Sequence, residues 1–198
     1  MSKELTTKSL FQQSDVQKRF EQLLGKKAQG FISSVLQVVN GNNILSKANP
    51  TTVLNAAATA AALDLPINPN LGFAWIVPYK GNAQFQMGWK GYVQLALRTG
   101  QYERINVTEV HENQFKSFNA LTEELDADFS VHGSGDVVGY VAYFKLINGF
   151  EKTEYWSKEK GMHHAKRFSQ SYTSSSSPWK DKTLFDAMAK KTVLKNMI

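Results

Sequence analysis

Apolar residues in the first third of the chain recur every three or four positions, which is the period of an amphipathic helix. This pattern predicts helices over residues 15–24, 31–39 and 53–65. The third is rich in alanine, begins after Asn49-Pro50 and stops at Pro66, as capping and proline chemistry favour. Residues 1–14 are polar and without a period, so we expect a loose arm there. With the first helix they form a segment, residues 1–30, for which we predict contacts between subunits.

The pattern changes to alternation after Pro66, which indicates strands. Asn148-Gly149 between two apolar runs is a strong hairpin signal. A serine-rich loop covers residues 169–177, and Pro178 is expected to open the last helix. The predicted strands are 73–77, 84–87, 105–110, 137–147 and 150–156, and the predicted helices are 92–97, 157–168 and the one after Pro178. We therefore predict an α+β fold: a central antiparallel sheet with β-hairpins, packed by several helices into one compact domain over residues 31–198.

The composition narrows the class of protein. The chain has 198 residues, of which 42% are hydrophobic, so it can bury a core. It contains no cysteine, which excludes disulfides and thiolate metal sites. No apolar run approaches the roughly 20 residues of a membrane-spanning helix, and the first residues do not resemble a signal peptide. We expect a cytoplasmic protein without a membrane partner.

Charge is distributed unevenly along the chain. Residues 1–144 hold 12 basic and 12 acidic residues, whereas residues 145–198 hold 11 basic and 5 acidic residues and thus the whole net charge of +6. A basic end favours a polyanionic partner. The acidic stretch between Glu103 and Asp136 could meet the basic end of a neighbouring copy. The alternative is that both stretches are solvated faces without a partner.

Motifs for nucleotide or metal chemistry are missing from the sequence. It has no phosphate-binding loop, no dinucleotide fingerprint and no H-E-x-x-H motif. His163 and His164 are adjacent and would point about 100° apart on a helix, so they suit solvent or phosphate better than one shared metal. The acidic residues from Glu109 to Asp128 could supply a magnesium site, but nothing fixes their spacing. We assign no catalytic and no metal-binding residue.

The remaining signal combines basic and aromatic residues, which suit phosphates and unpaired bases respectively. Glycines 81, 88 and 91 between them would let another backbone come close. Lys191 and Lys195 are four apart and share a helix face, with Lys190 to one side. Trp75, Trp89 and Trp156 are expected in the core, whereas Trp179 is either exposed or an anchor at a helix start. The candidate DNA-binding residues are Lys80, Lys90, Tyr92, Arg98, Arg104, Lys166, Arg167, Trp179, Lys180, Lys190, Lys191 and Lys195.

Three segments resemble a known family, the RecT branch of the RecT/Redβ class of phage single-strand annealing proteins. The resemblance covers the chain from about Phe31 onward. Gly88-Trp89 stands where the family often has glycine and tyrosine, and Lys195 stands where arginine is common. The segments are Asn49-Pro50 to Leu65, then Ile76 to Tyr79 with Gln84 to Tyr92 and Leu95 to Gly100, and finally Pro178-Trp179 with Met188 to Lys195.

The resemblance implies an ATP-independent protein of phage or prophage homologous recombination, acting in the cytoplasm of the bacterial host. Such a protein binds single-stranded DNA, pairs it with a complementary strand and assembles into a homo-oligomeric ring or helical filament. A phage exonuclease and the host single-strand-binding protein are the implied partners. The chain stops inside its predicted last helix, so we expect the C-terminal partner-binding region to be absent. No cofactor is required; a dependence of annealing on Mg²⁺ would need no bound site.

Three alternatives remain open at this point. A sequence-tolerant nucleic-acid-binding module, such as an RNA chaperone, would bind strands without speeding their annealing. A metal-dependent nuclease would cleave DNA when magnesium is present. A purely structural assembly protein would form oligomers whose size does not respond to DNA.

Overall fold

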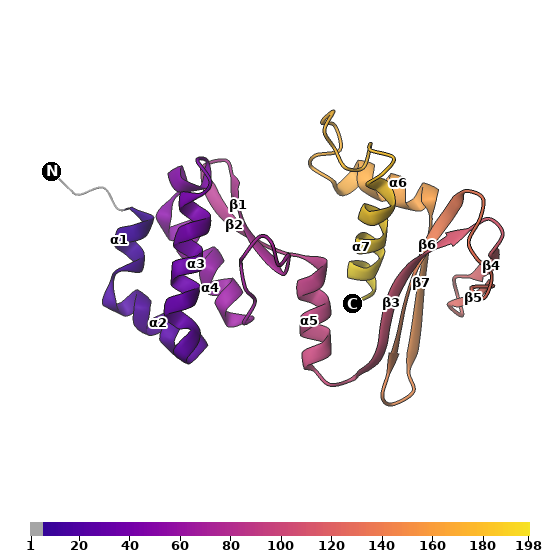
Figure 1. The fold of residues 1–198 in the computed structure, drawn as a ribbon, viewed down its shortest axis with the longest axis horizontal. Helices are drawn as coiled ribbons and strands as arrows, with labels where there is room; N and C mark the ends of the chain where they lie inside the picture. Colours follow the sequence, from indigo (N-terminus) through magenta and orange to yellow (C-terminus); the bar gives the residue numbers. More distant parts are fainter. Residues whose placement is uncertain (1–5) are drawn as a thin grey trace. The chain divides into compact units, whose positions relative to one another are not determined.

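The computed structural model describes residues 6–198 and has a mixed α+β fold with antiparallel sheets and several helices, which confirms the predicted class (Figure 1). The chain divides into two compact units, Met1–Leu95 and Ala96–Ile198. Each unit has its own elements and buried residues and is described separately. The described residues form three separate sheets in place of one central sheet.

Helices make up most of the first unit. They are α1 (Thr7–Phe11), α2 (Ser14–Leu24), α3 (Ala28–Asn40) and α4 (Pro50–Ala62), with short 3₁₀ turns η1 (Gly25–Lys27) and η2 (Leu45–Lys47) between them. Asn49 caps α4, because its side chain accepts a hydrogen bond from the Thr51 amide at 3.0 Å. The predicted helices over residues 15–24, 31–39 and 53–65 are therefore all present, with shifted ends.

The expectation of a loose arm over residues 1–14 is wrong for its described part. Thr6 and Ser9 form a capping box that starts α1. Phe11 is 1% exposed, and its ring stacks on that of Phe20 at 5.6 Å. Phe20 in turn stacks on Phe31 at 5.8 Å. This aromatic series anchors the N-terminal helices in the core, while residues 1–5 lie outside the described part of the chain.

A two-stranded sheet completes the first unit. Strand β1 (Ala74–Tyr79) pairs antiparallel with β2 (Asn82–Met87). Alanines of α4 allow close packing against this hairpin, and the Ala83 amide donates a hydrogen bond to the Thr52 hydroxyl at 2.8 Å. Helix α5 (Trp89–Arg98) follows β2 directly.

Two glycines bring the start of α5 against the chain's own backbone. A Cβ at Gly88 would lie 2.4 Å from the Gly72 carbonyl oxygen, and one at Gly91 would lie 2.4 Å from that of Phe73. The Gly88 amide donates to the Phe73 carbonyl at 2.9 Å. The close approach that these glycines predicted therefore involves residues 72–73 of the same unit.

The second unit is built on a three-stranded antiparallel sheet in the order β3-β6-β7. Its strands are β3 (Tyr102–His111), β6 (Val137–Leu146) and β7 (Glu151–Ser157). Asn148-Gly149 forms the predicted hairpin turn, with Gly149 at φ +89°. A separate hairpin of β4 (Phe115–Asn119) and β5 (Glu124–Ala127) was not predicted; its Phe115 ring stacks on Tyr155 at 5.0 Å.

Two helices pack on this sheet. Helix α6 (Lys158–Phe168) is capped by the predicted Ser157, and helix α7 (Phe185–Met197) lies against β6 and β3. The last helix was expected to begin at Pro178, but residues 178–184 form turns. Trp179 lies in those turns and is buried with its ring edge-on to Phe185 at 5.5 Å. It anchors the approach to α7.

Candidate nucleic-acid interface

A hollow of about 340 Å³ opens between α6 and α7 in the second unit. Lys191 and Lys195 of α7, whose spacing predicted a shared helix face, both line it. Phe168 is 61% exposed and supplies an aromatic surface from α6, beside His164 at 4.7 Å between ring centroids. The full lining is His164, Ala165, Phe168, Ser169, Trp179, Met188, Lys191, Thr192, Lys195 and Asn196. The hollow thus combines positive charge with ring surfaces.

The electrostatics of this hollow favour an anionic ligand. Burial removes water from the Lys191 ammonium and lowers its pKa, and the neighbouring Lys195 charge lowers it further. Burial also lowers the pKa of His164, with a smaller effect from Lys160. Within residues 6–198, no carboxylate lies at salt-bridge distance from Lys191. A partly buried cation such as Lys191, with no carboxylate nearby, indicates a functional site, because a bound anion would offset the free-energy cost of burying its charge.

The side of α7 that meets the sheet is fixed there by two polar contacts. The Tyr140 hydroxyl donates a hydrogen bond to the Asp186 carboxylate at 2.5 Å, and burial together with this carboxylate raises the pKa of Tyr140. Lys190 forms a salt bridge with Glu109 of β3 at 2.6 Å. Asp186 and Lys190 are four residues apart and share a face. The salt bridge therefore holds Lys190 against the sheet, and Lys191 and Lys195 line the hollow.

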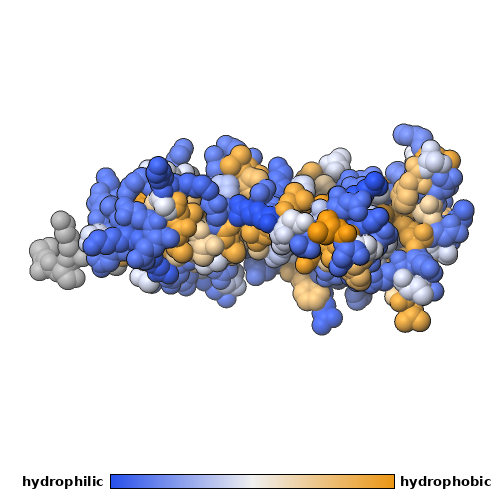
Figure 2. Space-filling view, turned by 90° about the horizontal axis from the view of Figure 1, so that it is seen from below, coloured by the Kyte–Doolittle hydropathy of each residue, from blue (hydrophilic) through white to orange (hydrophobic). Residues whose placement is uncertain are grey.

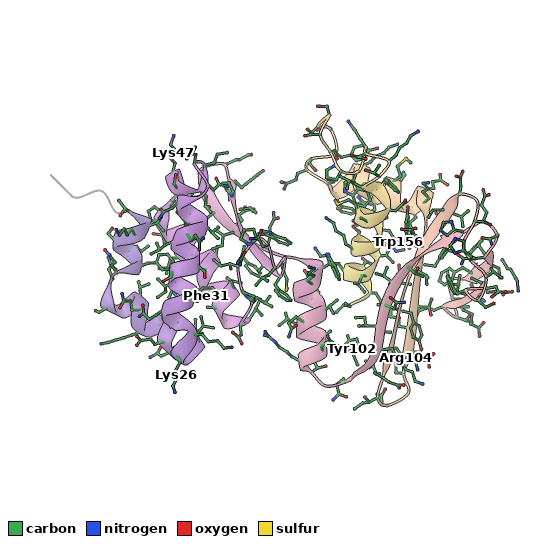
Figure 3. The ribbon with its side chains drawn as sticks, viewed as in Figure 1. Lys26, Phe31, Lys47, Tyr102, Arg104 and Trp156 are labelled. Atoms are coloured by element: carbon green, nitrogen blue, oxygen red, sulfur yellow. The ribbon has the colours of Figure 1, made fainter. Side chains whose placement is uncertain are left out.

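Other predicted residues of this unit lie outside the hollow. Lys166 and Arg167 are exposed on α6, and the Arg167 guanidinium lies 5.1 Å from the Phe168 ring. The Lys180 ammonium donates to the Thr173 carbonyl at 3.2 Å. Arg104 is exposed on β3 (Figure 3) and Arg98 is exposed at the end of α5. Trp179 lines the hollow but is only 7% exposed, so it does not offer an open stacking face.

The first unit holds the remaining predicted residues. Lys80 sits in the turn between β1 and β2, in the left-handed conformation with φ +47°, and its ammonium lies 5.4 Å from the Tyr79 ring. At the start of α5, the Lys90 ammonium lies 6.0 Å from the ring of Trp89. Tyr92 is partly buried on the same helix.

Of the three tryptophans predicted to lie in the core, only one is fully buried. Trp156 is 3% exposed, as predicted for the core. Trp89 is 38% exposed, so its assignment to the core is wrong, and Trp75 is half-buried. Exposed Trp89 beside Lys90, like exposed Tyr79 beside Lys80, pairs a cation with an aromatic ring in the way that nucleic-acid surfaces do.

Sequence reasoning missed a further group of cations on the helices of the first unit. Residues 1–95 contain 9 basic and 4 acidic residues, a net charge of +5, whereas residues 96–198 contain 14 and 13, a net charge of +1. The surface of the helical unit in Figure 2 is accordingly mainly hydrophilic, and Lys26 and Lys47 project outward in Figure 3. The additional exposed residues include Lys8, Lys18, Arg19, Lys26 and Lys47. Counting charge by structural unit would have found them.

A second cavity in the second unit, of about 1150 Å³, has an acidic wall. Its lining includes Glu109, Glu123, Glu124 and Glu151 beside two histidines, so it disfavours a polyanion. Three of these carboxylates also have a lysine partner within salt-bridge distance. Across residues 6–198, no group of three or more potential metal ligands converges.

Comparison with known proteins identifies the family. The model of the RecT family matches residues 29–198. This chain belongs to the RecT family. An uncharacterized protein, YqaK of Bacillus subtilis (strain 168), is 51% identical to it over 193 residues, which cover 98% of this chain. The aligned region spans 66% of the length of YqaK.

Membership of the RecT family confirms the resemblance seen in the sequence. None of the helices in the described part of the chain is long and apolar enough to cross a membrane.

Proposed function

We propose that this RecT-family chain binds single-stranded DNA and pairs it with a complementary strand without hydrolysing ATP, in phage or prophage recombination. The observation that carries the proposal is the pair Lys191 and Lys195 at a partly desolvated hollow within the matched region. Lysines neutralise phosphates of any sequence, so this site favours binding that does not depend on base identity.

The hollow suits a short piece of a single strand. The two ammonium groups would bind phosphate oxygens, and the exposed Phe168 ring would stack on a base. In the first unit, the exposed cation–aromatic pairs Lys80 with Tyr79 and Lys90 with Trp89 would offer the same combination of charge and ring to a strand. Held by its backbone, the strand keeps its pairing edges available to a second strand.

Annealing then requires no chemical step. Each stacked base-pair step contributes about 1.4 kcal/mol, so matched strands are retained and mismatched strands dissociate. We therefore assign no catalytic residue and no required cofactor. Mg²⁺ would act by screening the two strands from each other, not through a bound site.

Assembly and partners are part of the same proposal. Copies of the chain would form a homo-oligomeric ring or filament that aligns successive DNA sites, with the segment 1–30 at the contact between copies. A phage exonuclease would supply the single strand, and the host single-strand-binding protein would share it. The place of action would be the cytoplasm of the bacterial host.

The experiment measures annealing of two complementary oligonucleotides that carry a fluorophore and a quencher. The wild-type chain should quench fluorescence faster than buffer does. The variant Lys191→Met/Lys195→Met should slow annealing and reduce the salt dependence of binding by about 1.4, since each single-strand phosphate contact contributes about 0.7. A matched control, Lys158→Met/Lys182→Met, removes two exposed lysines of the same unit and should behave like wild type.

The outcomes separate the alternatives. Binding without faster annealing would identify a nucleic-acid-binding module and refute the proposal. Cleavage of labelled DNA in magnesium would indicate a nuclease. Oligomers that neither bind nor respond to DNA would indicate a structural assembly protein.

A further inference from the structure

We propose that Glu109 competes with DNA for Lys190 and so keeps one positive charge of α7 out of the single-strand contact. The inference rests on the proposed function, because it concerns which lysines of α7 are available to phosphate.

The geometry of the pair supports this role. Glu109 Oε1 lies 2.6 Å from Lys190 Nζ, and the two side chains are only 28% and 34% exposed. A charge pair at this distance and depth is screened less by solvent than a surface pair. The second carboxylate oxygen of Glu109 lies 3.9 Å from His111 Nε2. Lys190 is therefore the close cationic partner of Glu109.

The position of Lys190 on α7 makes the restraint relevant to DNA. Lys190 directly precedes Lys191 and is rotated from it by about 100° around the helix axis. Its ammonium sits on a flexible four-carbon stem, so a released Lys190 can turn toward a phosphate beside Lys191. In the wild type, such a phosphate must first displace the Glu109 carboxylate. Lys190 then contributes little to counterion release.

Removing the charge of Glu109 should strengthen DNA binding, which is the opposite of what a purely structural substitution does. Glutamine keeps the shape of the side chain but removes the negative charge that holds the Lys190 ammonium. In Glu109→Gln, Lys190 becomes available as one additional phosphate contact. The salt dependence of binding should steepen by about 0.7. A fourfold rise in salt should then cost the variant about 2.6 times more affinity than it costs wild type.

The experiment measures fluorescence anisotropy of a labelled oligothymidine with the full chain at 50–200 mM salt. Glu109→Gln should bind more tightly at 50 mM and show the steeper slope, and Glu109→Ala should show the same change independently. Glu109→Gln/Lys190→Gln should return the slope to the wild-type value. Lys190→Gln alone should leave the slope unchanged, since this lysine is already occupied.

A matched control removes a carboxylate from the same strand. Glu103 lies on β3 and pairs with Lys145 at 3.7 Å, so Glu103→Gln changes the net charge equally without releasing a lysine of α7. It should keep the wild-type slope. The restraining role of Glu109 would be refuted if Glu103→Gln gained as much DNA affinity as Glu109→Gln, or if neither Glu109 variant gained affinity. Either result would leave the proposed function intact. Failure of the wild-type chain to bind single strands would refute both.

Discussion

Replacing Gly91 by alanine tests whether the glycines near Trp89 serve the fold or a ligand. A Cβ at Gly91 would lie 2.4 Å from the Phe73 carbonyl oxygen and 2.8 Å from Met87 Cγ. These distances fall about 1 Å short of ordinary contact. Alanine favours a helix over glycine by about 1 kcal/mol, but overpacking of this kind costs about 1–3 kcal/mol or more. Since a backbone carbonyl cannot rotate away, we expect the upper part of this cost, and after the helix gain the free energy of unfolding should fall by up to about 2 kcal/mol.

The measurement is urea denaturation of both proteins, followed by single-strand binding at a temperature where both are folded. The control is Gly30→Ala in α3, where a Cβ meets nothing within 4 Å and alanine should stabilise the helix by up to about 1 kcal/mol. The folded Gly91→Ala variant should bind DNA normally. If the Gly91→Ala variant is as stable as wild type but binds DNA poorly, the reasoning is refuted. Gly91 would then leave room for a bound ligand and not for the backbone of residue 73.

Three further substitutions test other parts of the structure. Lys191→Met should weaken DNA binding yet raise stability, because it removes a desolvated charge beside Lys195. The lowered pKa of Lys191 also means that wild-type stability rises as pH increases through that pKa, a rise that melting curves of the variant should lack. Tyr140→Phe should lower the free energy of unfolding by about 1.5–3 kcal/mol through loss of the Asp186 hydrogen bond; an unchanged urea midpoint would contradict this. Phe11→Ala should cost about 3–5 kcal/mol if α1 is part of the core, whereas a loose arm would tolerate it.

Local signals account for the parts of the fold that the sequence could predict. The period of apolar residues located the helices, and Asn148-Gly149 located the hairpin of β6 and β7. The burial of Phe11 could not be predicted from the spacing of apolar residues, because α1 contains only two, Leu10 and Phe11, and two residues do not define a period. That burial depends on Phe20, which belongs to another helix. The β4–β5 hairpin was not predicted for a similar reason. An irregularity between Phe115 and Ser117 interrupts the alternation of apolar and polar residues along β4.

In the candidate site, too, spacing within one helix could be predicted, whereas contacts with elements distant in the sequence could not. The spacing of Lys191 and Lys195 predicted that they share a face, and the structure places both at one hollow. The spacing could not reveal that Lys190 is held by Glu109, because this partner lies on a strand far away in the sequence. The sequence also did not show where the chain divides into units, so its net charge was assigned to the C-terminal end alone.

The two separate cores have a consequence for melting experiments. Because each unit buries its own cluster of residues, denaturation is not required to be one cooperative step. Trp75 and Trp89 belong to one unit and Trp156 and Trp179 to the other, so single-tryptophan versions of the chain would follow each transition by its own fluorescence. A ligand shifts the melting of the unit that holds it. Adding an oligonucleotide to such a melt would show which half of the molecule carries the strand.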